Sequence, residues 1–242
     1  MKPRKAVIVA AGLSSRLYPL TAETPKALLP IGDETLLARS IRLLRDTGIS
    51  EIAVVVGFRA DSIREAVDTA TAVIPNPFFR HCNNMGSLMF ARDFAGDDSF
   101  VYLHGDLAYT GATLDAFLGA ARDPGPSCLD LLTAFGEVDE EAMKVRVDGG
   151  NTLIESSKSI PHEDAAGEWT GIAVVQRPRV VFDEIERHMM NVGLSDYDTA
   201  AFTSLARAGN VIRCIPANGD AWKEIDTMED LEDARSQFGQ PR

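Results

Sequence analysis

The stretch KAVIVAAGLSSRLYPLTAETPKALLP, residues 5–30, decides how this chain folds. An apolar run at 6–11 ends at Gly12, and a polar loop that carries Arg16 and Lys26 follows it. A buried strand that feeds a glycine turn is how α/β proteins bring backbone N–H groups to a phosphate chain. Arg16 adds a planar fork of donors and Lys26 a point charge. The stretch therefore predicts a phosphate-binding loop, although a glycine turn alone would equally follow a core strand.

Strands and helices alternate regularly after this loop. Apolar and β-branched runs predict strands at 52–56, 71–74 and 100–104. Helical spacing of apolar residues predicts helices at 35–47, 58–68 and 84–94. This alternation is typical of an α/β fold with a doubly wound, mostly parallel, Rossmann-like sheet.

The pattern changes past the Pro-Gly-Pro turn at 124–126. The Asp-Gly-Gly turn at 148–150 predicts a β-hairpin of 145–147 with 152–155. Further strands are predicted at 129–135, 170–175 and 211–216, and helices near 178–190, at 198–208 and after Asp226. The second half should therefore be a mixed sheet with a hairpin or lid region that builds a substrate pocket.

The composition restricts the classes of partner. The net charge of −12 argues against a nucleic-acid binder or a protein of anionic membranes, because both need basic surface. Residues 1–26 are nevertheless basic, so we expect positive charge to gather near the phosphate loop. The charged residues of this segment are Lys2, Arg4, Lys5, Arg16 and Lys26, against Glu23 alone.

Cysteine usage and apolar run lengths favour a cytoplasmic protein. Cys82, Cys128 and Cys214 are widely spaced and fit neither a metal site nor a disulfide framework. The apolar run at 6–11 is too short for a signal peptide, and no run reaches membrane-spanning length. We therefore expect no membrane insertion. The four histidines lack a spacing typical of a triad or a zinc site and are expected to be structural.

Two carboxylates stand where a site could form. Asp106 follows a predicted strand, and ligands of open α/β sheets bind beyond such strand ends. Asp226 closes a short apolar stretch in WKEIDTMEDL. Asp106 could equally cap a turn, and Asp226 or Thr227 would make a good helix N-cap.

Residues 5–30 resemble the signature LAAGxG(S/T)RxxPLTxxxPKxLxP of the sugar-phosphate and phosphocholine nucleotidylyltransferases. Ser14 stands where many members have a second glycine. The resemblance implies a GT-A-like nucleotidyltransferase fold over 1–242, with a nucleotide-binding half at 1–125 and an acceptor-binding half at 126–242. It implies that the triphosphate is held by Ala10, Ala11, Gly12, Leu13, Ser14, Ser15, Arg16 and Lys26. Asp106 and Asp226 occupy the family's positions for Mg²⁺ ligands, which suits the oxygen donors that this ion prefers. Arg16, Lys26, Asp106 and Asp226 would then be the catalytic residues.

Residues 76–90, NPFFRHCNNMGSLMF, resemble the corresponding segment of cytidylyltransferases that act on phosphocholine or phosphonates. The resemblance implies that Asn76, Asn84 and Ser87 contribute to nucleotide binding and that CTP is the donor. Asn83 and Asn84 could instead be simple helix caps.

The resemblance also implies an acceptor site. Lys158 would grip the acceptor's phosphate or phosphonate, with Glu168 and Gly171 in the same pocket; taken alone, Lys158 would be an ordinary surface lysine. An aromatic box for a quaternary ammonium group could draw on Tyr109, Trp169, Tyr197 and Trp222.

The sequence thus predicts a Mg²⁺-dependent enzyme that transfers CMP from CTP to a small acceptor and releases pyrophosphate. The acceptor would be of the phosphocholine, 2-aminoethylphosphonate or 2-hydroxyethylphosphonate type. A sugar-1-phosphate or inositol-phosphate nucleotidylyltransferase that uses UTP, dTTP, GTP or CTP is the alternative within this chemistry. A regulatory subunit that binds a nucleotide without catalysis is the alternative outside it, and a homodimer stays open.

Overall fold

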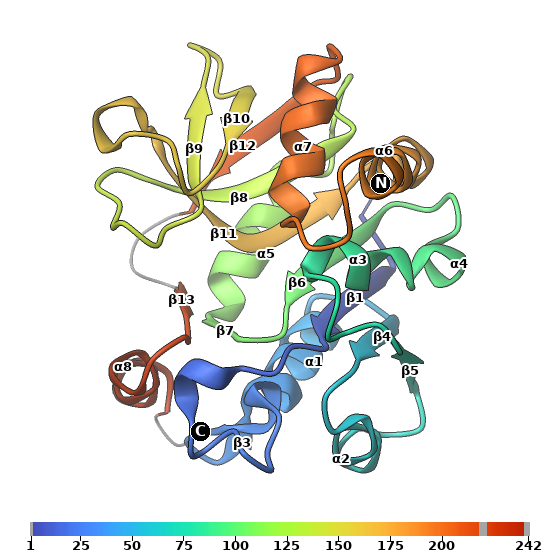
Figure 1. Ribbon diagram of the computed structural model, residues 1–242, viewed down its shortest axis with the longest axis vertical. Helices are drawn as coiled ribbons and strands as arrows, with labels where there is room; N and C mark the ends of the chain where they lie inside the picture. The colour runs from blue at the N-terminus through green and yellow to red at the C-terminus, as the bar shows by residue number, and fades with distance from the viewer. Residues whose placement is uncertain (1, 218–221, 240–242) are drawn as a thin grey trace.

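The computed structural model describes residues 2–217 and 222–239 (Figure 1). Within these residues, a nine-stranded mixed sheet has the order β10-β9-β11-β6-β1-β4-β5, with β8 pairing with β11 and β12 with β8. Its strands are β1 (Lys5–Ala10), β4 (Glu51–Val56), β5 (Thr71–Pro75), β6 (Phe100–His104), β8 (Leu129–Phe135), β9 (Lys144–Val147), β10 (Leu153–Ser156), β11 (Gly167–Val175) and β12 (Ile212–Pro216).

Strands β5, β4, β1 and β6 are parallel to one another and form the parallel part of the sheet that the sequence predicts. The chain passes from β1 to β4 and β5 on one side, and then returns to place β6 on the other side of β1. This reversal is a topological switch point, and the carboxyl ends of the two strands beside it are where open α/β sheets bind ligands.

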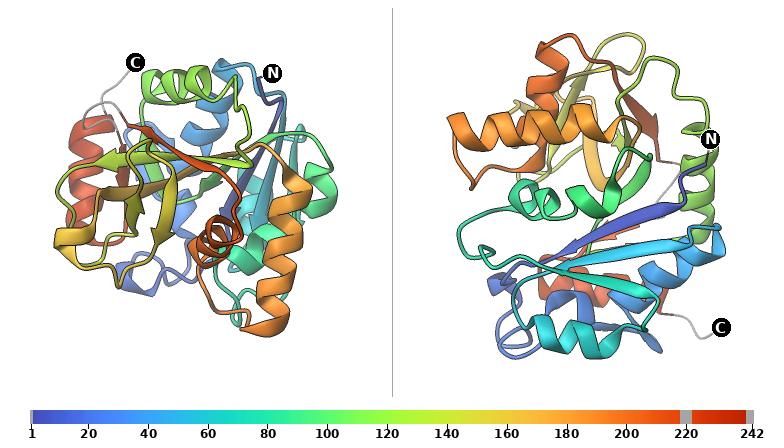
Figure 2. Two further views of the ribbon diagram at one scale, coloured as in Figure 1. Left: turned by 90° about the horizontal axis from the view of Figure 1, so that it is seen from above. Right: turned by 90° about the vertical axis from the view of Figure 1, so that its right-hand side faces the viewer.

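Helices cover both faces of the sheet (Figure 2). Val7 and Val9 of β1 pack into one apolar cluster, while Ala6 and Ile8 pack into another, so both faces of the strand are buried. The helices on the first face are α3 (Asn84–Met89), α4 (Arg92–Ala95), α6 (Pro178–Asn191) and α7 (Asp198–Arg207). Those on the second face are α1 (Leu36–Asp46), α2 (Ala60–Ala66) and α5 (Gly111–Ala120).

Strand β11 joins the two halves of the sheet. Its carboxyl-terminal residues pair antiparallel with β6, and Gly167 and Glu168 at its start pair with β9. The β9–β10 hairpin is the one predicted from the Asp-Gly-Gly turn, with Asn151 in the left-handed region. The hairpin therefore continues the sheet past the start of β11.

Two short pairs of strands complete the fold. Strand β13 (Trp222–Glu224) pairs antiparallel with β7 (Leu107–Tyr109), and β2 (Pro30–Ile31) pairs with β3 (Glu34–Thr35). The last helix, α8 (Met228–Phe238), begins after Thr227, whose hydroxyl accepts from the Asp230 amide in a capping box. Thr227, and not Asp226, is therefore the N-cap.

The predicted α/β class with a mixed sheet is confirmed, with local differences. The helix predicted at 84–94 is two helices, because Phe90 and Ala91 donate to carbonyls three residues back. Helix α5 and strands β7 and β13 were not predicted from the sequence pattern. The three cysteines form no disulfide, and no helix in the described ranges has the length and apolarity needed to cross a lipid bilayer.

Candidate active site

The end of β1 and the loop after it form one wall of a small cavity at the switch point. Ala10, Ala11, Gly12 and Ser14 line it together with Lys26, Asn84 and Asp106. Ser14 has φ +52°, a left-handed conformation that glycine adopts without strain, so a glycine would also fit this position. A second cavity next to it is lined by Gly12, Ser14, Ser15, Arg16 and Lys26. The predicted loop residues thus line these two cavities, except that the Leu13 side chain is 40% exposed and lines neither.

The centre of the site is a cation between two carboxylates. The Lys26 ammonium lies 2.7 Å from Asp106 Oδ2 and 2.8 Å from Asp226 Oδ1. Arg16 contacts the other oxygen of Asp226 at 2.7 Å. Lys26 is 11% exposed and the two carboxylates 22% and 23%, so the cluster is largely shielded from water. The four residues predicted to be catalytic therefore meet, although 200 residues separate Lys26 from Asp226.

Short strands bring Asp226 to this position. Asp106 lies at the turn between β6 and β7, and β13 pairs with β7 so that Glu224 faces Leu107. The Ile225 amide then donates to the Asp106 carbonyl at 3.0 Å. This pairing places the Asp226 side chain beside Asp106.

The ion cluster shifts the pKa values of its members. Burial opposes the charge on Lys26, but the carboxylates of Asp106 and Asp226 outweigh burial and raise the pKa of the lysine. Burial likewise opposes the charge on Asp106, but Lys26 and His104 outweigh it and lower the pKa of this carboxyl. The ammonium and the Asp106 carboxylate are therefore both ionised near neutral pH.

The donors around Asp106 fit a hard divalent cation such as Mg²⁺. Asp106 Oδ1 is buried and has no hydrogen-bond partner among the described residues, so one carboxylate oxygen is available as a ligand. Ligand atoms of His104, Asp106 and Glu224 all lie within 4.8 Å of one another. Oxygen donors from one or two carboxylates are what Mg²⁺ takes alongside phosphate. Burial and the nearby Asp106 raise the pKa of Glu224 to about 7.

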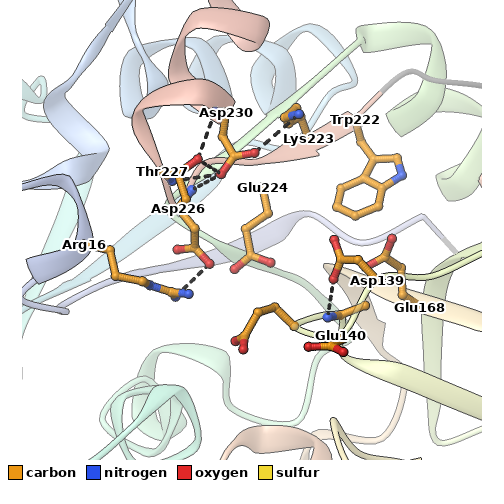
Figure 3. Close-up of a pocket in the computed structure, with 12 residues that line it drawn as sticks. Arg16, Asp139, Glu140, Glu168, Trp222, Lys223, Glu224, Asp226, Thr227 and Asp230 are labelled. Atoms are coloured by element: carbon orange, nitrogen blue, oxygen red, sulfur yellow. Dashed lines mark hydrogen bonds and ion pairs between the residues drawn. The ribbon is translucent and has the colours of Figure 1, made fainter. Parts of the chain in front are cut away.

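Glu224 is a site residue that the sequence reasoning missed. It lies two residues before Asp226, at the end of strand β13, so the two side chains share one side of the chain. Figure 3 shows both pointing into the same cavity. The signal in the sequence was the position of Glu224 two residues before Asp226 in WKEID, a segment too short to identify a strand.

His104 is also part of the site, against the expectation that the histidines are structural. Its Nε2 lies 3.0 Å from Asp198 Oδ2 and 3.1 Å from Asn84 Nδ2. Tyr102 donates to the same Asp198 oxygen at 2.6 Å. Burial would lower the pKa of His104, but Asp198 outweighs it and raises that pKa to about 9. The network joins Asn84, at the start of α3, to the first turn of α7.

Two glycines allow the close approaches around His104 and Asp106. A Cβ on Gly105 would meet the Ala10 Cβ at 2.9 Å and the Val9 carbonyl oxygen at 3.0 Å. Gly171 has φ +81°, and a Cβ there would lie 3.1 Å from His104 Nδ1. Gly171 therefore contributes space and backbone conformation to the predicted acceptor pocket.

The predicted acceptor residues line two adjoining cavities. Lys158 lies in a cavity of about 70 Å³ with Gly171, Tyr197 and Trp169. Its ammonium contacts Glu141 at 3.0 Å and lies 5.6 Å from the centre of the Tyr197 ring. The second cavity, of about 550 Å³, is mainly acidic (Figure 3); it is lined by Arg16, Asp139, Glu140, Glu141, Ala142, Glu168, Trp222, Lys223, Glu224, Asp226, Thr227 and Asp230.

Several predicted residues do not reach the site. Asn76 and Ser87 are buried, hydrogen-bond to each other at 3.0 Å, and line none of these cavities. Tyr109 is buried in β7 opposite Trp222 of β13 and lines none of these cavities. The four predicted aromatic residues therefore do not form one box.

The positive charge expected from the start of the chain is also not at the site. Lys5 begins β1, whereas the phosphate loop follows its other end, about 20 Å away at ~3.3 Å per residue. Lys5 instead pairs with Asp98, and Lys2 with Asp115. Of the five basic residues of that segment, Arg16 and Lys26 are the ones that line the site.

Glu168 should make stability depend on pH. Burial and the nearby Asp139 carboxylate raise the pKa of Glu168 from 4.5 to about 7, while Lys144 partly opposes them. A raised carboxyl pKa means that the folded state loses stability as pH rises from about 4.5 to 7. Glu168→Gln should therefore be more stable than wild type at pH 8 by roughly 1 kcal/mol, after allowance for solvent screening, and equal to it at pH 4.5.

Urea denaturation at the two pH values measures this difference, with Glu163→Gln on the surface as the matched control. A gap between Glu168→Gln and wild type that stays constant with pH would contradict the assignment.

The comparisons with known proteins agree with this geometry. Residues 6–140, more than half of the chain, match the family of MobA-like NTP transferase domains, so the chain belongs to that family. It is 27% identical over 254 residues to the CMP-5'-(3-aminopropyl)phosphonate synthase of Streptomyces rubellomurinus, covering 99% of this chain and 40% of that protein. It is 22% identical over 247 residues to the CTP:phosphoglutamine cytidylyltransferase of Campylobacter jejuni, covering 94% of this chain and 97% of that protein.

The fold is shared with solved nucleotidyltransferases. The structure of the inositol-1-phosphate CTP transferase from T. maritima superimposes with a TM-score of 0.81 at 19% identity, covering 100% of this chain and 99% of that one. The predicted GT-A-like nucleotidyltransferase fold and the likeness to cytidylyltransferases are thus confirmed. The chain spans about half the length, or less, of several curated relatives that it matches.

Proposed function

We propose that this chain is a Mg²⁺-dependent cytidylyltransferase that moves CMP from CTP to a small phosphate or phosphonate and releases pyrophosphate. The observation that carries the proposal is the Lys26 ammonium held between Asp106 and Asp226, at the carboxyl ends of β1 and β6. A cation and two carboxylates beside a phosphate-type loop suit a reaction in which anionic groups must approach one another.

The reaction needs no covalent intermediate with the protein. An oxygen of the acceptor phosphate or phosphonate attacks the α-phosphorus of CTP, and the bond from that phosphorus to the bridging oxygen breaks. Pyrophosphate carries away the electron pair of this bond. Because the attacking oxygen is already anionic, the protein has to align the two substrates and neutralise charge.

The residues of the site divide this work. The loop at Gly12 and Ser14 offers backbone donors to the triphosphate, and Arg16 and Lys26 bind its charge. Asp106 and Asp226 would hold Mg²⁺, with the Glu224 carboxylate within reach of Asp106. When bound, the ion would offset the repulsion between donor and acceptor phosphates.

CTP is favoured as the donor by two observations. The Asn84 side chain lines the cavity beside the phosphate loop, so an amide that can both donate and accept would face the nucleotide. The relatives from S. rubellomurinus and C. jejuni carry CMP or CTP in their names. Asn76 and Ser87 would act indirectly, by holding the segment before α3.

The acidic cavity favours an acceptor that carries a positive charge. Asp139, Glu140, Glu141 and Glu168 line it, and the Trp222 ring forms part of its wall. Such a surface attracts an ammonium group, while Lys158 remains for the acceptor's phosphate or phosphonate. We therefore place 2-aminoethylphosphonate and phosphocholine before 2-hydroxyethylphosphonate.

A screen of nucleotide and acceptor pairs tests the proposal. Pyrophosphate release is measured for CTP, UTP, dTTP and GTP with Mg²⁺ against phosphocholine, two-carbon phosphonates and several sugar-1-phosphates. CTP with an ammonium-bearing acceptor should give the largest kcat/KM. A larger value for UTP or dTTP with a sugar phosphate would replace the proposal by the sugar-nucleotide alternative. Release with no pair would favour a regulatory subunit.

Lys158→Met should raise the KM of the acceptor by roughly tenfold or more, because the side chain keeps its length and loses its charge. The KM of CTP should stay within about twofold, since Lys158 lines neither of the cavities formed by Gly12 and Ser14 of the phosphate loop. Steady-state kinetics with each substrate varied in turn measure this, with Lys2→Met as a surface control. An unchanged acceptor KM would remove Lys158 from the site.

A further inference from the structure

Lys144, at the start of β9, is a buried lysine that the reaction described above does not use. It is 2% exposed, and no other lysine of the described residues is buried as completely. Placing an ammonium in the interior is costly unless hydrogen bonds replace its water. The contacts that replace this water therefore indicate what Lys144 does.

The Lys144 ammonium bonds to the main chain of two separate loops. It donates to the Glu140 carbonyl at 2.9 Å and to the Lys158 carbonyl at 3.0 Å. We call residues 136–143 the acidic loop and residues 157–161 the lysine loop. The Lys144 main chain also bonds to both, because its amide donates to Ala142 and its carbonyl accepts from Ser157. One residue thus links the two loops through four hydrogen bonds.

Each of these loops carries side chains of the acceptor site. The acidic loop supplies Asp139, Glu140 and Glu141 to the cavity of about 550 Å³. The lysine loop supplies Lys158 to the cavity of about 70 Å³. The loops also meet directly, since the Lys158 ammonium contacts the Glu141 carboxylate at 3.0 Å. This side-chain contact is exposed, whereas Lys144 itself is buried and its ammonium bonds are partly buried.

We propose that Lys144 is a positioning residue that sets the distance between the acidic loop and the lysine loop, and so matches the site to the acceptor. Lys144 lines neither acceptor cavity, so it acts through Glu140 and Lys158 and does not touch the substrate. The proposal rests on the proposed function, in which these loops hold the two ends of the acceptor.

The phosphate loop does not depend on this linkage. Its residues and Lys26 are held by β1 and by the cluster with Asp106 and Asp226. Freeing the two loops should therefore weaken acceptor binding and leave CTP binding intact. A residue that merely stabilised the fold would change both substrates together or neither.

Lys144→Met tests the proposal, because methionine keeps an unbranched chain and removes the charge and all donors. We expect the acceptor KM to rise roughly tenfold, as expected when a binding group is misplaced by less than an ångström or so. The CTP KM should stay within about twofold. Lys144→Gln, which keeps two donors on a shorter chain, should recover part of the loss and serves as the folding-competent variant.

Thr203→Val is the matched control. Thr203 is buried, accepts from the Ser156 amide at 2.9 Å and donates to its carbonyl at 3.1 Å, so it links α7 to β10 without touching either loop. Its thermal stability should fall in the same way as that of Lys144→Met, while the KM values of both substrates stay unchanged.

Hydrogen exchange of the free protein provides a readout that needs no activity. In Lys144→Met, peptides of the acidic loop and of the lysine loop should both exchange faster, and peptides of residues 10–30 should not. Unchanged exchange in the two loops, faster exchange without a rise in acceptor KM, or a parallel rise in both KM values would each overturn the proposal. If wild type shows no transfer activity, the proposed function fails, and exchange still decides whether Lys144 links the loops.

Discussion

Lys26→Ala is expected to lower kcat for pyrophosphate release by about a thousandfold, the scale seen when one charge-stabilising donor is removed from an active site. The ammonium is the group that contacts both Asp106 and Asp226, and it lies beside Gly12 and Ser14 of the phosphate loop. No neighbouring side chain can replace it: Arg16 reaches Asp226 from the more exposed side, with 57% of its own side chain in water.

Lys26→Ala should also allow the Asp106 and Asp226 carboxylates to bind a cation more tightly. Without Lys26, Asp106 loses its ion-pair partner and Asp226 keeps Arg16. We expect the free energy of unfolding to fall by roughly 2 kcal/mol, below the range for fully buried pairs because the carboxylates keep some exposure. Added Mg²⁺ should then raise the Tm of Lys26→Ala more than that of wild type. Calorimetric scans with and without the ion measure this difference. Wild-type turnover in Lys26→Ala would contradict the assignment.

Asp106→Asn is expected to abolish measurable turnover, with a loss of about a thousandfold or more. Asparagine keeps the shape of the side chain, so Leu107 and the β7–β13 pairing beside it stay in place. The change removes a charge from the Lys26 cluster and replaces the carboxylate, whose Oδ1 has no partner among the described residues, by a neutral amide, which is a weaker metal ligand. Raising the Mg²⁺ concentration should not restore the activity of Asp106→Asn.

The matched control is Asp115→Asn on α5, which pairs with Lys2 away from the site. It should keep wild-type kcat and KM. Circular dichroism should show that Asp106→Asn is folded, so that lost activity reports chemistry. A kcat within tenfold of wild type in Asp106→Asn would remove Asp106 from the reaction.

The parallel part of the fold could be predicted because its strands are buried on both faces. In β1 and β4, nearly every residue is apolar or β-branched. Val7 and Val9 of β1 pack into one hydrophobic core, and Ala6 and Ile8 pack into the core on the other face of the sheet. Local pattern suffices for such strands. It does not suffice for β7 and β13. Each has only three residues, and the two strands stabilise each other by pairing although more than a hundred residues of sequence separate them.

The residues of the site were predictable where a motif fixes the backbone. Gly12 and Asp106 follow the ends of β1 and β6, and the parallel pairing of these strands brings those ends together. Lys26 joins them from a short 3-10 helix later in the predicted motif. Glu224 and His104 were missed because their role depends on contacts of β13 and α7 that no local pattern encodes.

Asn76 and Ser87 show the opposite error. Both have the polar side chains that a nucleotide site needs, but each satisfies the other in the interior. The composition of a segment indicates which groups are available, and burial decides which of them face the ligand. The basic residues Lys2 and Lys5 fail for a related reason, because they lie at the far end of the strand that carries the loop.

Phosphorus NMR of the product tests the central claim most directly. Wild-type protein is mixed with CTP, Mg²⁺ and 2-aminoethylphosphonate, and the spectrum is followed with time. The account predicts two new coupled resonances, from the phosphonate and the phosphate of a CMP–phosphonate anhydride, with one pyrophosphate per anhydride, and neither in Asp106→Asn. If CTP stays intact with 2-aminoethylphosphonate and with phosphocholine while another nucleotide reacts with a sugar phosphate, the account is contradicted.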